Sequence, residues 1–342
     1  MILPPRPPVT RLRGRTTAEA REGSGAQDLP GFEPKWCDIV HYIVGITEEI
    51  WSDAAVDRIR ATYADDCVIH TSMGTTRGVE GVVVGTVQSL WAFTDFSTEH
   101  LNVAWSHDER GFYTSHLGFA RSVNTGQTLY GPATNAQLAR HFAADCISLD
   151  NRIHTEWLAR DNRTGLMQMG LDPVAVARML AELPAPEPLA PLPPDAPGLP
   201  EPGDPATPWG YAERLFAHWN ARAFASAAAS YVGDAQAHWP GMQEAAGPRA
   251  VAQLMIGLLA SVPDGLFRVE HVCWSEEADG PIVAVRCRLD GTSSPFGAVG
   301  DMPAERPVAM IGMSHYRMDG NRIVEEWTVF DDVALIVQAH RA

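Results

Sequence analysis

Cysteine is scarce in this sequence, and the few cysteines are far apart. There are five, an odd number, and no two stand close enough to frame a zinc site or a redox dithiol. We therefore expect buried free thiols in a reducing cytoplasm: Cys37, Cys67, Cys146, Cys273 and Cys287.

Long hydrophobic runs are also missing. The sequence has no stretch of about 18 apolar residues, the length that could span a membrane. Residues 1–30 carry five arginines and several prolines but lack the apolar core of a signal peptide. The sequence predicts a cytoplasmic protein with a disordered N-terminal extension over residues 1–30.

Positive charge is in short supply, and several catalytic motifs are absent. Lys and Arg number 26 against 42 Asp and Glu, so the formal net charge of −16 disfavours nucleic acid and membrane surfaces as partners. There is no HExxH, Gly-rich phosphate loop or GxSxG motif. His154 and Glu156 alternate to one side of one predicted strand, but no third metal ligand accompanies them. We expect neither a metal nor a cofactor.

What is present indicates two domains. A chain of 342 residues with 45% hydrophobic content can bury two cores. Residues 182–208 contain 11 prolines, too many for a helix or a central strand, and are predicted to be a linker. The predicted domains therefore cover residues 31–181 and 209–342.

The two predicted domains are copies of one unit. Three landmarks recur in the same order at offsets of 168, 169 and 170 residues. Three ordered matches at nearly constant spacing indicate a duplication. They are YADDCVIH (Tyr63–His70) with YVGDAQAH (Tyr231–His238), VAWS (Val103–Ser106) with VCWS (Val272–Ser275), and NRIHTEWLARDN (Asn151–Asn162) with NRIVEEWTVFDD (Asn321–Asp332).

Each copy begins with helical periodicity and continues with strands. Three helices are expected per copy; Asp53 is the predicted N-cap of the second helix in the first copy. Helices followed by a meandering antiparallel sheet predict an α+β fold, with the helices on one face of the sheet. The predicted strands are Glu99–His107, Phe112–Arg121, Gln137–Leu149 and Arg152–Arg160, then Phe267–Trp274, Ile282–Leu289, Val308–Met318 and Arg322–Phe330.

The unit order and the phrase EWLARDNRTGLMQMGLDP, which recurs in part as EEWTVFDDVALIVQA, resemble the SnoaL-like polyketide cyclases of the nuclear-transport-factor-two-like superfamily. The resemblance covers about residues 36–180 and 208–340. It implies two tandem cone-shaped α+β barrels, in which helices pack on a strongly curved antiparallel sheet. The superfamily hosts cyclases, isomerases, dehydratases, epoxide hydrolases and non-catalytic proteins, so the fold alone does not decide the function.

The resemblance implies an acid/base aspartate at Asp161 and, in the second copy, at Asp331. A carboxylate at the mouth of an apolar cone is partly desolvated, so its pKa rises and it becomes a better base toward a carbon acid. The alternative is a helix cap, because both residues stand where a strand ends and a helix begins.

His70 and His238 follow the first strand of each copy. They are candidates either to assist at the enolate or to be ordinary hydrogen-bonded histidines at a strand end.

Several aromatic residues recur at matching positions in the two copies. Strand tryptophans and a tyrosine placed at the end of the second helix could line the cone and contact a substrate, or could belong to the core. The candidates for substrate binding are Tyr63, Trp105, Trp157, Tyr231, Trp274 and Trp327.

These features predict a cofactor-independent enzyme that abstracts a proton next to a carbonyl in a small, apolar, cyclic or aromatic substrate. Cyclisation, isomerisation and elimination share this step. One alternative is an epoxide-hydrolase-like hydrolase, although its usual Asp–Arg–Asp relay is not visible, because Arg160 alternates away from Asp161 along the strand. The other is a non-catalytic small-ligand-binding module.

We further expect the sheets of the two copies to pack as a pseudo-dimer within one chain, with a homo-oligomer as a further possibility. The first copy, which has the fuller C-terminal tail, is expected to carry more of the activity.

Overall fold

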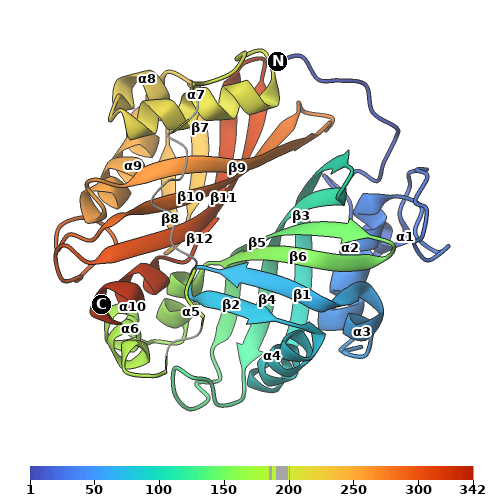
Figure 1. Ribbon diagram of the computed structural model, residues 1–342, viewed down its shortest axis with the longest axis horizontal. Helices are drawn as coiled ribbons and strands as arrows, with labels where there is room; N and C mark the ends of the chain where they lie inside the picture. The colour runs from blue at the N-terminus through green and yellow to red at the C-terminus, as the bar shows by residue number, and fades with distance from the viewer. Residues whose placement is uncertain (185–186, 190–198, 200, 342) are drawn as a thin grey trace.

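The computed structural model describes residues 1–184, 187–189, 199 and 201–341 (Figure 1). Much of the proline-rich segment expected as a linker lies outside the described residues. The first half of the chain contains α1 (Thr17–Glu22), α2 (Ile39–Thr47), the π-helix η1 (Glu48–Ser52), α3 (Arg58–Thr62), β1 (Tyr63–Thr71), β2 (Gly74–Arg77), α4 (Val79–Ala92), β3 (Phe93–Asp108), β4 (Gly111–Asn124), β5 (Gln137–Leu149), β6 (Arg152–Arg160), α5 (Asn162–Gln168) and α6 (Pro173–Ala181).

The second half repeats this order from α7 onward. Its elements are α7 (Pro208–Asn220), α8 (Phe224–Ala228), β7 (Tyr231–Trp239), β8 (Gln243–Ala246), α9 (Pro248–Ser261), β9 (Leu266–Ser275), β10 (Ile282–Thr292), β11 (Pro307–Asp319), β12 (Arg322–Phe330) and α10 (Asp332–Arg341).

The twelve strands of the described residues form one sheet in the order β2-β1-β6-β5-β4-β3-β9-β10-β11-β12-β7-β8. The second six strands mirror the first six, and the halves join where Trp105 of β3 pairs with Trp274 of β9. The sheet is mixed, because β1 runs parallel to β6 and β7 runs parallel to β12. This corrects the expected antiparallel sheet: helix α4 and four strands separate β1 from β6 in sequence, so the direction of β1 is not set by a hairpin.

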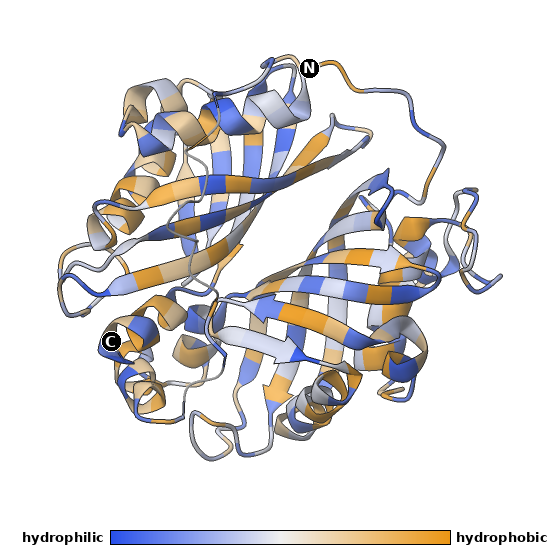
Figure 2. Cartoon of the chain, viewed as in Figure 1, coloured by the Kyte–Doolittle hydropathy of each residue, from blue (hydrophilic) through white to orange (hydrophobic). Residues whose placement is uncertain are grey.

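Each half of the sheet has two different faces. We call the face covered by the helices of its own half the inner face, and the face toward the other half the facing side (Figure 1). Apolar and polar residues alternate along the strands, as the bands of colour in Figure 2 show. In the first half, α2, β1 and the neighbouring strands bury one apolar cluster that includes Tyr42, Ile59 and Ile153. The second half buries a larger cluster, which α5 and α6 of the first half join.

The two facing sides pack against each other through small apolar clusters and a buried polar network. Leu117 and Ala143 of the first half meet Ile311 and Met313 of the second. Buried hydrogen bonds also cross between the halves, as from Asn102 Nδ2 to Ser275 Oγ (2.7 Å) and from Ser115 Oγ to His315 Nε2 (3.0 Å).

The N-terminal segment also connects the halves, which differs from the disordered extension expected for residues 1–30. The amide of Ile2 donates to the carbonyl of Ala206, and the guanidinium of Arg6 lies 4.4 Å from the ring of Trp105 and 3.8 Å from that of Trp274. Further along, α1 lies over β3. Composition alone did not predict this ordered segment, because the arginines are held by aromatic rings and carboxylates that come together only on the folded surface. None of the described helices is long and apolar enough to cross a membrane.

The helix boundaries differ from expectation in several places. Asp53 follows the π-helix and pairs with Arg21, whereas α3 begins five residues later, after Asp57. Tyr63 and Tyr231, expected at the end of a helix, are the first residues of β1 and β7.

Candidate functional site

The last strand of the first half separates the candidate site residues onto two faces. Glu156 and Arg160 alternate with Trp157, Ala159 and Asp161 along β6. Glu156 contacts Tyr63 on the inner face, whereas Ala159 packs with Ile311 of the other half. Because neighbouring residues of a strand point to opposite faces, Arg160 lies on the inner face and Asp161 on the facing side.

A chain of three buried ionisable groups lies on the inner face of the first half. His100 Nε2 is 2.8 Å from Glu48 Oε1, and His100 Nδ1 is 2.9 Å from His116 Nε2. Glu48 comes from the π-helix, and the two histidines come from β3 and β4. All three residues are less than 8% exposed. We call Glu48, His100 and His116 the relay.

The carboxylate fixes the positions of the protons in the relay. Where Nε2 of a neutral His100 donates to the Glu48 carboxylate, Nδ1 of the same ring is an acceptor. His116 must then donate from Nε2, which leaves a lone pair on its Nδ1. Within the described chain, no hydrogen-bond partner is found for that atom. Burial and the neighbouring His100 and His315 hold the pKa of His116 well below its usual value, so the imidazole is neutral at pH 7.

A second buried pair lies on the same inner face. Tyr63 Oη donates to Glu156 Oε2 at 3.0 Å. Burial raises the pKa of Glu156, although the hydrogen bond from Tyr63 lowers it in part, and burial together with the charge of Glu156 raises the pKa of Tyr63. The pair therefore tends to retain its protons. Arg160 also points to this face; burial lowers its pKa, and Arg140 nearby lowers it further.

The second half has apolar residues where the first has the relay histidines. Both β3 and β9 bulge at the same place, and the ladders align His100 with Val269 and His116 with Val285. Val285 is 1% exposed and belongs to the core of the second half. The relay is thus specific to the first half.

The Tyr–Glu pair occurs in both halves, with different surroundings. Glu326 accepts hydrogen bonds from Tyr231 Oη (2.7 Å), Trp239 Nε1 (2.8 Å) and Thr328 Oγ1 (2.5 Å). Glu156 accepts only the hydrogen bond from Tyr63 among the described residues. The carboxyl group in the first half therefore keeps an oxygen for another partner.

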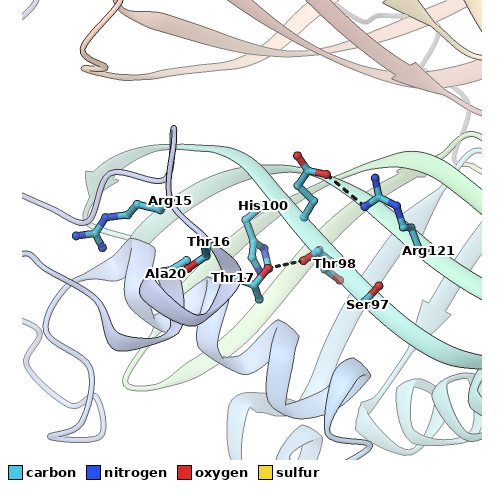
Figure 3. Close-up of a pocket in the computed structure, with 9 residues that line it drawn as sticks. Arg15, Thr16, Thr17, Ala20, Ser97, Thr98, His100 and Arg121 are labelled. Carbon is cyan, nitrogen blue, oxygen red and sulfur yellow. Dashed lines mark hydrogen bonds and ion pairs between the residues drawn. The ribbon is translucent and has the colours of Figure 1, made fainter.

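A cavity of about 360 Å³ adjoins the relay, between α1 and β3 (Figure 3). Most of its lining residues are polar, and Thr17 Oγ1 donates a hydrogen bond to the carbonyl of Thr98 at 3.0 Å. Arg121, at its rim, is 3.2 Å from Glu99. The lining residues are Arg15, Thr16, Thr17, Ala20, Ser97, Thr98, Glu99, His100 and Arg121.

The two predicted catalytic aspartates lie at the junction of the halves. Asp161 is the N-cap of α5: it accepts hydrogen bonds from the amide (2.8 Å) and hydroxyl (2.5 Å) of Thr164, and from the amide of Gly241 in the other half. Asp331 accepts from Asn162 Nδ2 at 2.6 Å and from the amide of Ala334 at 3.3 Å. Burial raises the pKa of Asp161 and raises that of Asp331 to about 7. This geometry is that of the capping alternative, with an added link between the halves.

The two predicted histidines lie on the facing sides and do not approach the aspartates. His70 stacks on Trp157 at 5.6 Å, and burial lowers its pKa. His238 stacks on Trp327 at 5.8 Å, and its hydrogen bond to Glu325 raises its pKa. No contact of either ring with Asp161 or Asp331 is found in the described chain.

The predicted substrate-binding aromatics divide between the two faces. Tyr63 and Trp105 belong to the inner cluster of the first half, and Tyr231 to that of the second. Trp157 and Trp327 pack between the halves, and Trp274 holds Arg6. No group of three or more metal-ligating side chains is found in the part of the chain that is described.

Sequence reasoning missed the relay. His100 and His116 were visible only as two of 12 histidines, and Glu48 as one of many carboxylates in a helix. The signal that could have found them is the difference between the copies, because equivalent strand positions hold histidine in one and valine in the other.

Comparison with known proteins finds one family model that matches the second half. Residues 211–339 match the family model of the SnoaL-like polyketide cyclases. No curated protein matches the chain.

Solved structures similar to this chain cover about two fifths of it. IdmH, a putative polyketide cyclase from Streptomyces antibioticus, is 23% identical, covers 39% of this chain and 97% of its own, and has a TM-score of 0.33. AclR, a putative hydroxylase from Streptomyces galilaeus, is 22% identical over 37% of this chain and 81% of its own, with a TM-score of 0.32. A putative SnoaL-like polyketide cyclase from Jannaschia sp. CCS1 is 18% identical over 42% of this chain and 99% of its own, with a TM-score of 0.33.

Proposed function

We propose that this protein is a cofactor-independent acid/base enzyme of the cyclase, isomerase or lyase type, with its active centre on the inner face of the first half. The observation that carries the proposal is the relay, which presents an unpartnered ring nitrogen of His116 backed by His100 and Glu48. The family match of residues 211–339 supports the same class of chemistry. The substrate is a small, largely apolar carbonyl compound.

In the proposed step, His116 Nδ1 takes a proton from the carbon next to the substrate carbonyl. The Nε2 proton of His116 passes to His100 Nδ1, and the Nε2 proton of His100 passes to Glu48. The positive charge that would otherwise remain on a buried imidazole is neutralised by the carboxylate. The electron pair of the broken C–H bond moves to the carbonyl oxygen as an enolate.

The Tyr63–Glu156 pair is the proposed donor to that enolate oxygen. Burial raises the pKa of both groups, which shifts each of them toward its protonated form. A neutral carboxyl group in an apolar site can donate a hydrogen bond to a developing anion without a competing charge. Glu326 is already satisfied by three donors and its half has no relay, so we assign the chemistry to the first half.

We also propose that the two halves are tandem copies of one cone-shaped unit, paired within the chain. The shared element order, the bulge at the same place in β3 and β9 and the mirrored strand order support this. In this arrangement Asp161 and Asp331 cap helices and link the halves rather than remove protons.

The test is deuterium exchange, because it needs no knowledge of the final product. The full chain is incubated in D2O with a panel of cyclic ketones, and NMR follows the loss of signal from protons next to the carbonyl. His116→Asn should slow exchange by about 10²- to 10⁴-fold, the usual size of general-base assistance.

The matched control is His154→Asn, which changes an exposed histidine of the same half. With this variant the substrate protons should exchange at the wild-type rate. Equal rates for wild type and His116→Asn on a substrate that the protein turns over would contradict the proposal.

A further inference from the structure

Arg160, on the inner face of the first half, has no hydrogen-bonding or ion-pair partner in the described part of the chain. Its side chain is partly buried, and no hydrogen bond or ion pair to it is found among the described residues. A desolvated guanidinium is costly unless an anion or several acceptors accompany it.

The groups around Arg160 do not supply that anion. The charges that act on it are those of Arg140 and Glu156, together with Tyr130 and Tyr63. Glu156 forms no ion pair with Arg160 among the described residues, and burial raises its pKa. Arg140 is a second cation, held by a hydrogen bond from its Nη1 to Asn162 Oδ1 at 3.0 Å. The surroundings therefore favour an external anion.

The fold does not require arginine at this place. The equivalent last residue of β12 is Phe330, which is 4% exposed and packs edge-on against Trp239 at 5.5 Å. The same strand end thus accepts an aromatic core residue in the second half. A charge at Arg160 is better explained by a ligand than by packing.

The strand register places Arg160 in one row with the relay. Arg160 pairs with Phe142, Phe142 with Gly118, and Gly118 with His100. The ring of Phe142 lies over Gly118, where a Cβ atom would be 2.4 Å from it, and meets His116 edge-on at 5.3 Å. An apolar ring therefore separates the cation from the base.

We propose that Arg160 binds the carboxylate of the substrate, which is an organic acid with an apolar middle and a carbonyl group at the end that reaches His116. This rests on the proposed function and names the substrate class for that site. The planar guanidinium matches a carboxylate through two parallel hydrogen bonds. One free guanidinium beside a carboxyl group suits a singly charged carboxylate better than a doubly charged phosphate.

The experiment measures binding rather than turnover, so that it can succeed or fail independently of the proposed chemistry. The full chain is titrated by calorimetry with benzoate, benzamide and inorganic phosphate. Benzoate should bind, and benzamide, which has the same shape without the charge, should bind about 10- to 100-fold more weakly. Phosphate binding as tight as that of benzoate would contradict the carboxylate assignment.

Three variants locate the site. Arg160→Phe, which introduces the residue of the second half, should lose benzoate affinity by about 10- to 100-fold, and Arg160→Lys should keep part of it. Arg322→Met, which changes an exposed arginine of β12, should bind as wild type does. Undiminished benzoate affinity in Arg160→Phe would overturn the proposal.

Two further results separate the possible failures. Without ligand, Arg160→Phe should melt at or above the wild-type temperature, because an unpaired cation is removed; a clearly lower melting temperature would show that Arg160 has a structural partner and would contradict the proposal. His116→Asn should still bind benzoate. If benzoate binds through Arg160 but no exchange at carbon depends on His116, the inference stands and the proposed function fails.

Discussion

The carboxyl group of Asp331 should make the stability of this protein depend on pH in a way that one substitution removes. Burial and, to a smaller extent, the charge of its neighbour Asp332 raise its pKa from 3.8 to about 7. Between these two pH values the folded protein holds a proton that the unfolded chain has released. Stability therefore falls as pH rises toward 7, and this contribution is constant above it.

The magnitude follows from one proton. A difference of one bound proton changes the free energy of unfolding by about 1.4 kcal/mol per pH unit, so about 2 kcal/mol is expected between about pH 5 and pH 7. Asn at this position mimics the protonated side chain at every pH. The stability of wild type relative to Asp331→Asn should therefore decrease by about 2 kcal/mol over that range.

The difference between the two proteins is the quantity to measure. Buried histidines with lowered pKa, such as His271 and His315, give the opposite slope below their unfolded pKa. That background is common to both proteins and cancels. Urea unfolding at several pH values gives the two curves. Parallel curves of the free energy of unfolding against pH would refute the reasoning, because they would show that the pKa of Asp331 is the same in the folded and unfolded states.

Three further predictions follow from the site and the junction. Asp161→Asn should leave exchange activity unchanged and lower the free energy of unfolding by about 1 kcal/mol, since Asn can still cap α5; a loss of activity with intact folding would restore Asp161 as the base. Glu156→Gln should slow exchange, because an amide is a weaker hydrogen-bond donor than a carboxylic acid, and Glu326→Gln should not, because only the first half has the relay; equal losses would place the chemistry elsewhere. Scattering in solution should report the mass of one 37.2 kDa chain, since the halves pair internally, and a multiple of it would indicate pairing between chains.

The sequence predicts the strands well because their signals are local. The bounds of β5 and β6 agree with the expected Gln137–Leu149 and Arg152–Arg160, since alternation and polar turns mark both ends. The π-helix at Glu48–Ser52 was not predicted, because its side chains do not differ from those of an ordinary helix.

The site was harder to predict because it depends on which face of each strand is the inner face. Alternation shows that Arg160 and Asp161 point in opposite directions but not which one points inward. The contact between His100 and His116 depends on the register of β3 against β4, which a bulge beside Leu101 shifts by one residue. A pattern of neighbouring residues determines neither the inner face of β6 nor the register of β3 against β4.

The protonation of His116 tests the account most directly. Nitrogen NMR of the histidine rings distinguishes a nitrogen with a lone pair from one that carries a proton, and His116→Asn assigns the signals. We predict that His116 carries its proton on Nε2, keeps a bare Nδ1 and is neutral at pH 7, because burial holds its pKa well below the usual value. A proton on Nδ1 of a neutral ring, or a charged ring at neutral pH, would contradict the relay and the base it provides.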